Sequence, residues 1–167
     1  MYAVGTLVLY SRMGVCRVES IGAAPSPQAA GRSYYKLRSV FSSGNELVIY
    51  APVDTAIFMR PLISGAEAVD YLERFPCLEP QGPADAAGCQ ELLDSCRLES
   101  WLLLLRELYG KRRELARRRR RLAQAEEQCL KVAERLVCEE FAAVLHTTPE
   151  VIREQLCTAA EPKQITA

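Results

Sequence analysis

The chain has 167 residues, of which 49% are hydrophobic and 25% are charged, a composition typical of a folded globular protein with one or two small domains. This balance argues against a fibrous protein and against a disordered one. The 21 basic and 21 acidic side chains cancel, so the whole chain is not the polycation that marks many nucleic-acid-binding proteins.

Residues 1–62 are predicted to form a small β domain. Five short segments are rich in β-branched and aromatic residues and are separated by glycine and proline; they cover residues 6–10, 15–21, 33–40, 46–50 and 56–59. A flat sheet of this size would leave its edges and one face unprotected, so the pattern favours a small twisted barrel.

Residues 63–160 are predicted to form an all-helical domain, because the hydrophobic period changes from two to about 3.6 near Ser64. Ser64 and Glu67 have the spacing of a capping box. The expected order is a connecting helix over residues 64–75, a linker over 76–88, a helical bundle over 89–157 and a flexible tail over 158–167.

Two amphipathic helices dominate the predicted bundle. Apolar residues, including Trp101, repeat at helical spacing from Leu98 to Tyr109, and Gly110 is expected to end or weaken this helix. A second apolar stripe runs from Leu122 to Val144. The polar residues of that segment are expected to face water: Glu126, Glu127, Lys131, Glu134, Arg135 and Glu139.

Several classes of function lack support in the sequence. The longest apolar runs are too short to span a bilayer, and no signal peptide is evident. Seven scattered cysteines without a C-x-x-C pair, and His146 as the only histidine, favour a reducing cytoplasm over disulfides or a metal site. Cys129 and Cys138 lie on the apolar side of a helical pattern and are expected to be buried thiols. Without nucleotide-binding or nucleophile motifs, we expect neither an enzyme nor a cofactor.

The strongest local signal is a basic run. Residues 101–125 carry 9 basic and 2 acidic side chains, a charge of +7 that the acidic stretches on either side cancel. The run is compatible with a solvated helix end or an interhelical turn, and equally with binding of phosphate or an acidic surface. The candidate DNA-binding residues are Lys111, Arg112, Arg113, Arg117, Arg118, Arg119, Arg120 and Arg121.

Residues 1–62 carry an ordered set of short motifs. Val4-Gly5 precedes a Leu7-to-Tyr10 strand, and Gly14-Val15, Tyr34-Tyr35-Lys36-Leu37, Pro52-Val53-Asp54-Thr55-Ala56 and Arg60-Pro61-Leu62 follow. In this order they resemble the CarD-like proteins and the RNA-polymerase-interacting domain of the bacterial transcription-repair coupling factor. In the helical half, Leu104 to Tyr109 and Leu130 to Leu145 look like two helices of the same family.

One departure from the family pattern concerns DNA. Members carry a W-x-x-R-Y segment soon after the first helix, whose tryptophan is associated with wedging into promoter DNA. Residues 76–96 contain neither tryptophan nor tyrosine, and Trp101 lies on the apolar stripe, where core packing is expected. Any DNA contact is therefore expected to use phosphates and not intercalation.

The resemblance implies a bacterial transcription regulator with a Tudor/SH3-like barrel that binds the RNA polymerase β subunit. The helical domain would contact promoter DNA, mainly its phosphates, and stabilise the open complex. A strand of the partner could add to the barrel edge. The candidate polymerase-binding residues are Arg32, Tyr34, Lys36, Arg38, Glu46, Val48 and Tyr50.

Two other interpretations stay open. In one, the protein binds polymerase but its helical domain binds an acidic protein and not DNA. In the other, it is a dimeric interaction module that pairs through one of its apolar helix stripes. The two interpretations that include polymerase binding imply a monomer or weak dimer in the cytoplasm. The protein would be associated with the nucleoid through polymerase.

Overall fold

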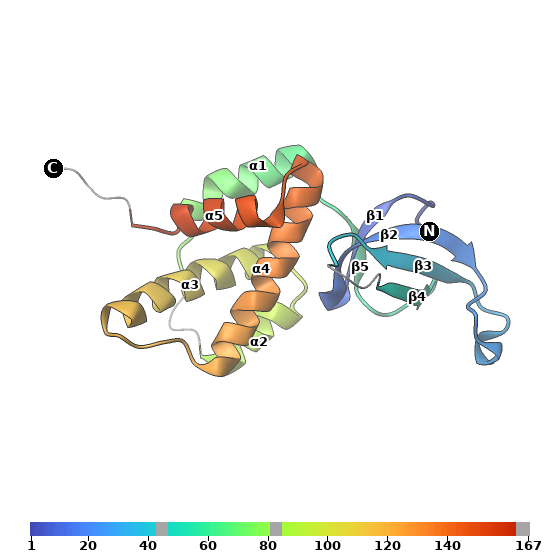
Figure 1. Cartoon of the computed structure of the whole chain (residues 1–167), viewed down its shortest axis with the longest axis horizontal. Helices are drawn as coiled ribbons and strands as arrows, with labels where there is room; N and C mark the ends of the chain where they lie inside the picture. Colours follow the sequence, from blue (N-terminus) through green and yellow to red (C-terminus); the bar gives the residue numbers. More distant parts are fainter. Residues whose placement is uncertain (43–46, 81–84, 163–167) are drawn as a thin grey trace. The chain divides into compact units, whose positions relative to one another are not determined.

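The computed structural model describes residues 1–42, 47–80 and 85–162 and divides the chain into two units, Met1–Ile63 and Ser64–Ala167. The first unit contains a five-stranded antiparallel sheet and the second contains five α-helices (Figure 1), so the chain is an α+β protein. The change of hydrophobic period in the sequence lies at the junction of these two units.

The strands of the first unit lie close to the segments that the sequence predicts. They are β1 (Leu7–Tyr10), β2 (Gly14–Gly22), β3 (Tyr34–Ser39), β4 (Val48–Pro52) and β5 (Met59–Pro61). The last strand starts at residue 59 and not at 56. Their order in the sheet is β4-β3-β2-β1-β5, and in the described residues no backbone pairing joins β4 to β5. The sheet is therefore open, with β4 and β5 at its edges.

Alternate side chains of the strands build the core of this unit. Seven side chains, at most 6% exposed, form one cluster: Val8, Tyr10, Cys16, Val18, Tyr35, Leu37 and Ala51. The chain start covers this cluster, because the Tyr2 N–H donates to the Tyr35 hydroxyl at 2.9 Å and the Tyr2 hydroxyl donates to the Met59 carbonyl at 3.3 Å. Along β3, the buried Tyr35 and Leu37 alternate with half-buried residues, in agreement with the hydrophobic period of two.

The second unit begins with the predicted capping box. Ser64 accepts from the Glu67 N–H at 3.1 Å, and the Glu67 carboxylate accepts from the Ser64 N–H at 2.7 Å. These bonds start α1 (Gly65–Arg74), and a short 3-10 helix, η3 (Phe75–Cys77), follows it. The connecting helix is thus confirmed.

The predicted linker over residues 76–88 is partly wrong. Its first residues belong to η3, and α2 (Ala86–Asp94) starts inside it because the Asp85 side chain accepts from the Gly88 N–H at 2.7 Å and caps the helix. Residues 81–84 lie outside the described residues. The predicted tail over 158–167 also starts too early, since α5 (Pro149–Ala159) extends into it.

Gly110 does not end the first long helix. Helix α3 (Leu98–Arg117) continues through it for another seven residues. A helical glycine costs about 1 kcal/mol. The buried side chains that α3 contributes on the preceding turns, among them Leu105, Leu108 and Tyr109, offset this cost by tertiary packing.

Helix α4 (Gln124–Leu145) is the centre of the second unit, because it contacts each of the other four α-helices. Seven successive residues, 136–142, are buried, so α4 is covered on all sides in this region. The expectation that Glu126 and Glu139 face water is therefore wrong: they are 5% and 8% exposed. Glu140, next to Glu139, is fully buried.

None of the helices in the described parts of the chain is long and apolar enough to cross a membrane.

Candidate functional site

The candidate polymerase-binding residues gather on one face of the sheet. Tyr34, Lys36 and Arg38 alternate with the buried residues of β3. On β4, Tyr50 lies directly opposite Lys36, and Val48 lies directly opposite Arg38. Five of the seven predicted residues thus form a single patch across β3 and β4. Arg32 is exposed in the segment before β3, and Glu46 lies outside the described residues.

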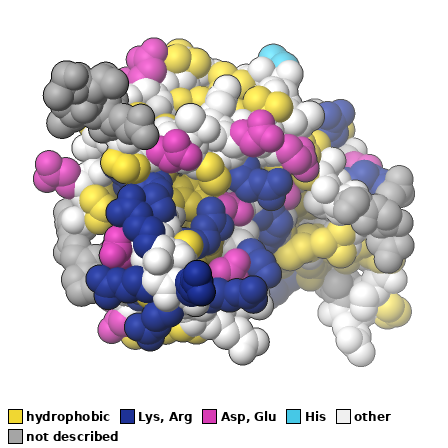
Figure 2. Space-filling view, turned by 60° about the vertical axis from the view of Figure 1, so that its left-hand side comes forward, with side chains coloured by type: hydrophobic (Ala, Val, Ile, Leu, Met, Phe, Trp, Pro, Cys, Tyr) yellow, Lys and Arg dark blue, Asp and Glu magenta, His cyan; other side chains and the backbone are white. Residues whose placement is uncertain are grey.

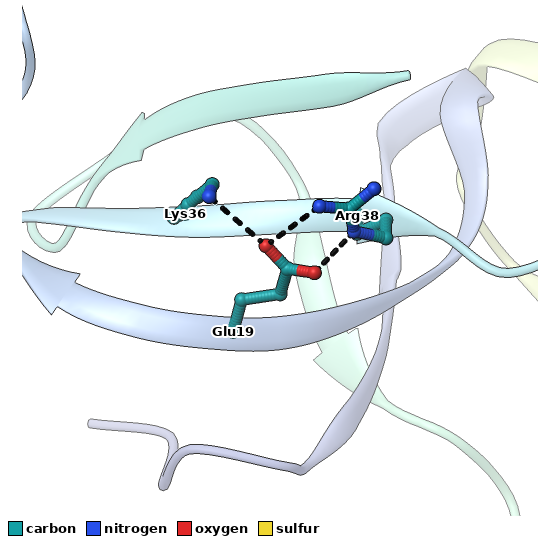
Figure 3. A network of polar contacts seen from close by, with 3 residues as sticks. All are labelled: Glu19, Lys36 and Arg38. Carbon is teal, nitrogen blue, oxygen red and sulfur yellow. Dashed lines mark hydrogen bonds and ion pairs between the residues drawn. The ribbon is translucent and has the colours of Figure 1, made fainter. Parts of the chain in front are cut away.

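A carboxylate that was not among these candidates joins two of them. Glu19 of β2 lies between Lys36 and Arg38 (Figure 3), with its Oε2 at 3.2 Å from Lys36 Nζ and at 3.3 Å from an Arg38 terminal nitrogen. Arg38 Nε also donates to Glu19 Oε1. These bonds, from Arg38 first and then Lys36, hold the pKa of Glu19 below its usual value.

A β-bulge places Glu19 there. Val18 pairs with Leu37 and Ser20 pairs with Lys36, so Glu19 is the extra residue between two consecutive rungs of the ladder. Arg17 lies directly opposite Arg38, an arrangement in which like charges repel, and the Glu19 carboxylate offsets this repulsion. The patch therefore keeps a modest positive charge with its side chains held in fixed positions.

Strand β4 exposes a backbone edge beside this patch. The Ser39 N–H donates to the Leu47 carbonyl, and the Val53 N–H donates to the Ser33 carbonyl, each at 3.0 Å. In this register the backbone N–H and C=O groups of Val48 and Tyr50 point away from β3. No strand lies beyond β4 in the described residues.

Most of the arginine run lies beyond the end of α3. Arg117 is the last residue of α3, and Arg118 to Arg121 form the turn toward α4. The interpretation as an interhelical turn is therefore confirmed for these four residues. The Arg119 N–H donates to the Ala116 carbonyl at 3.0 Å and the Arg120 N–H donates to the Leu115 carbonyl at 2.8 Å, which is the Schellman pattern. Arg119 has the left-handed conformation, with φ of 55°.

Hydrogen bonds or ion pairs within the chain engage four of the eight candidate DNA-binding side chains. Lys111 pairs with the buried Glu126 of α4. Arg113 donates to the Ala160 carbonyl at the end of α5 at 2.8 Å. Exposed ion pairs join Arg117 and Arg118 to Glu114 at 3.8 and 3.3 Å. Arg112 stacks over the Tyr109 ring at 5.2 Å, a contact that leaves the edge of its guanidinium accessible.

A groove of about 620 Å³ lies between the end of α3, the arginine turn and the first two turns of α4. Its cationic lining residues are Arg112, Arg120, Arg121 and Lys131. Figure 2 shows Lys and Arg side chains gathered on one face of the helical unit. Lys131 was not among the sequence candidates, because it lies 10 residues beyond the basic run, and helical packing brings it to the groove.

Trp101 and the buried cysteines belong to the core of the helical unit. Trp101 is 1% exposed, and its Nε1 donates to the Leu93 carbonyl at 3.1 Å, so the expected core role is confirmed. Burial raises the pKa of Cys89 to about 11 and that of Cys138 to about 12, which keeps both thiols protonated near neutral pH. Across the described ranges, no three His, Cys, Asp or Glu side chains are grouped to hold a metal ion.

Comparison with known proteins does not assign this chain to a family, since it matches no protein-family model and no curated protein sequence.

Proposed function

We propose that this protein is a bacterial transcription regulator that binds the RNA polymerase β subunit through residues 1–62 and promoter DNA through its helical unit. The proposal includes a Tudor-like identity for the first unit and stabilisation of the open promoter complex. It is supported by the ordered motifs of residues 1–62 that resemble CarD-like proteins. No catalytic role is proposed.

The observation that carries the polymerase half of the proposal is the exposed edge of β4. Val48 and Tyr50 direct four backbone hydrogen-bonding groups outward, and a strand of the partner could pair with them in antiparallel or parallel fashion. Tyr50 is 38% exposed, and its side chain offers apolar contact area on the face of the added strand. Lys36 and Arg38 lie on the same face and favour an acidic rim on the partner.

The test is co-purification of the full-length protein with the polymerase β subunit. Tyr50→Pro removes an outward N–H and places a ring on the edge, but leaves the β3–β4 hydrogen bonds intact, since Tyr50 does not donate to β3. Tyr50→Ala is the matched control, because it removes the same side chain and keeps the N–H. We expect Tyr50→Pro to abolish binding and Tyr50→Ala to weaken it.

Full binding by Tyr50→Pro would refute pairing at this edge. Circular dichroism of both variants checks that the sheet is retained.

The DNA half of the proposal depends on contacts between DNA phosphates and the basic side chains of the arginine turn and of the groove beside it. Because Trp101 is buried, an intercalating wedge is not part of the proposed contact. Fluorescence anisotropy with duplex promoter DNA at graded salt tests it. Binding that weakens steeply with salt supports the proposal. Absence of binding would instead favour the alternative in which the helical unit contacts an acidic protein.

A further inference from the structure

The eight basic residues from Lys111 to Arg121 are not equivalent in the folded protein. Glu126, Glu114 and the Ala160 carbonyl engage Lys111, Arg113, Arg117 and Arg118. To bind DNA directly, each of these four would have to give up an internal contact or share it. The groove beside the run has another set of cations, three from the run and one from α4.

The shape and charge of the groove suit an extended anion. Arg112, Arg120, Arg121 and Lys131 line it, and Glu127 is the one carboxylate among the lining residues, so the lining has a net charge of +3. All four cationic residues are exposed, as a site for a charged ligand from solvent requires. A guanidinium group can donate two parallel hydrogen bonds to the oxygens of one phosphate, and three of the four cations are arginines.

The start of α4 adds a second source of positive potential. This helix has 22 residues, and its first residue, Gln124, lines the groove. Ala123, at the N-cap, has no side-chain acceptor for the N–H groups of the first turn. The Glu126 carboxylate accepts from the Ala123 N–H at 3.0 Å and also pairs with Lys111, so it ties the end of α3 to the start of α4. The other N–H groups of the first turn form the positive end of the helix dipole.

We propose that this groove is a phosphate-binding site in which Arg112, Arg120, Arg121 and Lys131 hold consecutive phosphate groups of a phosphodiester chain. The inference rests on the proposed function in taking promoter DNA as the source of those phosphates. It narrows the set of DNA-contacting residues: Arg117 and Arg118 make no direct contact with the phosphates, and Lys131 makes one. Gln124 and Gln128 supply amide groups beside the phosphates and carry no charge.

The number of phosphates neutralised gives a measurable consequence. The logarithm of the binding constant falls with the logarithm of salt concentration, with a slope of about −0.9 per phosphate contacted on duplex DNA. Four contacts predict a slope of about −3.6, whereas contact by all eight basic residues of the run would give about −7. Lys131→Gln is expected to change the slope by about one unit.

The decisive comparison uses two double variants of the full-length protein that lose equal charge from the same run. Arg120→Gln/Arg121→Gln removes groove cations, and Arg117→Gln/Arg118→Gln removes the pair bound to Glu114. In fluorescence anisotropy with duplex DNA, we expect the groove variant to bind about tenfold more weakly. The slope of its salt dependence should be less negative by about two units. The control variant should change affinity less than about threefold.

Equal losses in the two variants would overturn the groove as the site and leave DNA binding itself standing. Titration with inorganic tripolyphosphate tests the phosphate site independently of DNA. Binding is followed by NMR through the backbone amide signals of Gln124 and Gln128. If DNA does not bind but tripolyphosphate shifts those signals, the phosphate site is supported and the DNA half of the proposed function fails. If neither binds, both are refuted.

Discussion

Replacement of Arg119 by glycine is expected to stabilise the helical unit. Arg119 occupies the C′ position of the Schellman motif after α3 with φ of 55°, a position where glycine is usual. The left-handed conformation costs a residue with a Cβ about 1–2 kcal/mol. Glycine avoids this cost but gives the unfolded chain extra freedom worth about 0.5–1 kcal/mol. The net gain for Arg119→Gly is therefore about 0.5–1 kcal/mol.

Urea unfolding followed by Trp101 fluorescence measures this gain. Trp101 is the only tryptophan, is 1% exposed and lies in α3, so its emission reports the unfolding of the helical unit. The midpoint should rise with an unchanged dependence on urea. Because the Arg119 side chain does not line the groove, affinity for duplex DNA should change little.

Arg119→Ala is the control that separates the effect of backbone conformation on stability from the effect of the positive charge. It removes the same positive charge from the arginine turn but keeps a Cβ in the left-handed conformation, so its stability should stay close to that of the wild type. If Arg119→Ala stabilises as much as Arg119→Gly, repulsion among the arginines is the cause and the argument from backbone conformation is wrong. A loss of stability in Arg119→Gly would refute the Schellman assignment itself.

Three further substitutions test other parts of the structure. Gly110→Ala should raise the stability by about 0.5–1 kcal/mol in the same urea assay, because position 110 is helical and an added Cβ meets no atom within 4 Å; a loss would mean that α3 breaks there. Arg106→Ala should lower it by about 1.5–3 kcal/mol, because the Ala160 carbonyl loses a charged donor at 2.9 Å, and an effect below 0.5 kcal/mol would show that this bond is dispensable. Glu19→Gln should speed amide hydrogen exchange in β3 at neutral pH. The bond from Arg38 lowers the pKa of Glu19 below 4.5, so the stabilisation is present above that pH and is lost as the pH falls through the lowered pKa. If the difference in β3 exchange rate between wild type and Glu19→Gln persists in acid, the stabilisation does not come from the ionised Glu19 carboxylate.

Local sequence determined the elements that depend on local physics. The capping box of Ser64 and Glu67 and the strands of residues 1–62 follow from neighbouring residues, and the structure has them at or near the expected positions. Trp101 could be assigned to the core for the same reason, since its place on the apolar stripe depends only on helical spacing.

Tertiary structure decided what the charged side chains do. Glu126 and Glu139 lie on faces of α4 that would be solvated in an isolated amphipathic helix, but packing of α4 against four other helices buries both. A bulge of a single residue, which strand propensity does not encode, brings Glu19 to Lys36 and Arg38. The basic run is obvious in the sequence. Only the packing of α3 on α4 pairs some of its residues with internal partners and brings Arg112, Arg120 and Arg121 together with Lys131 around one groove. Charge composition is a property of the chain, whereas the availability of each charge depends on contacts between residues far apart in sequence.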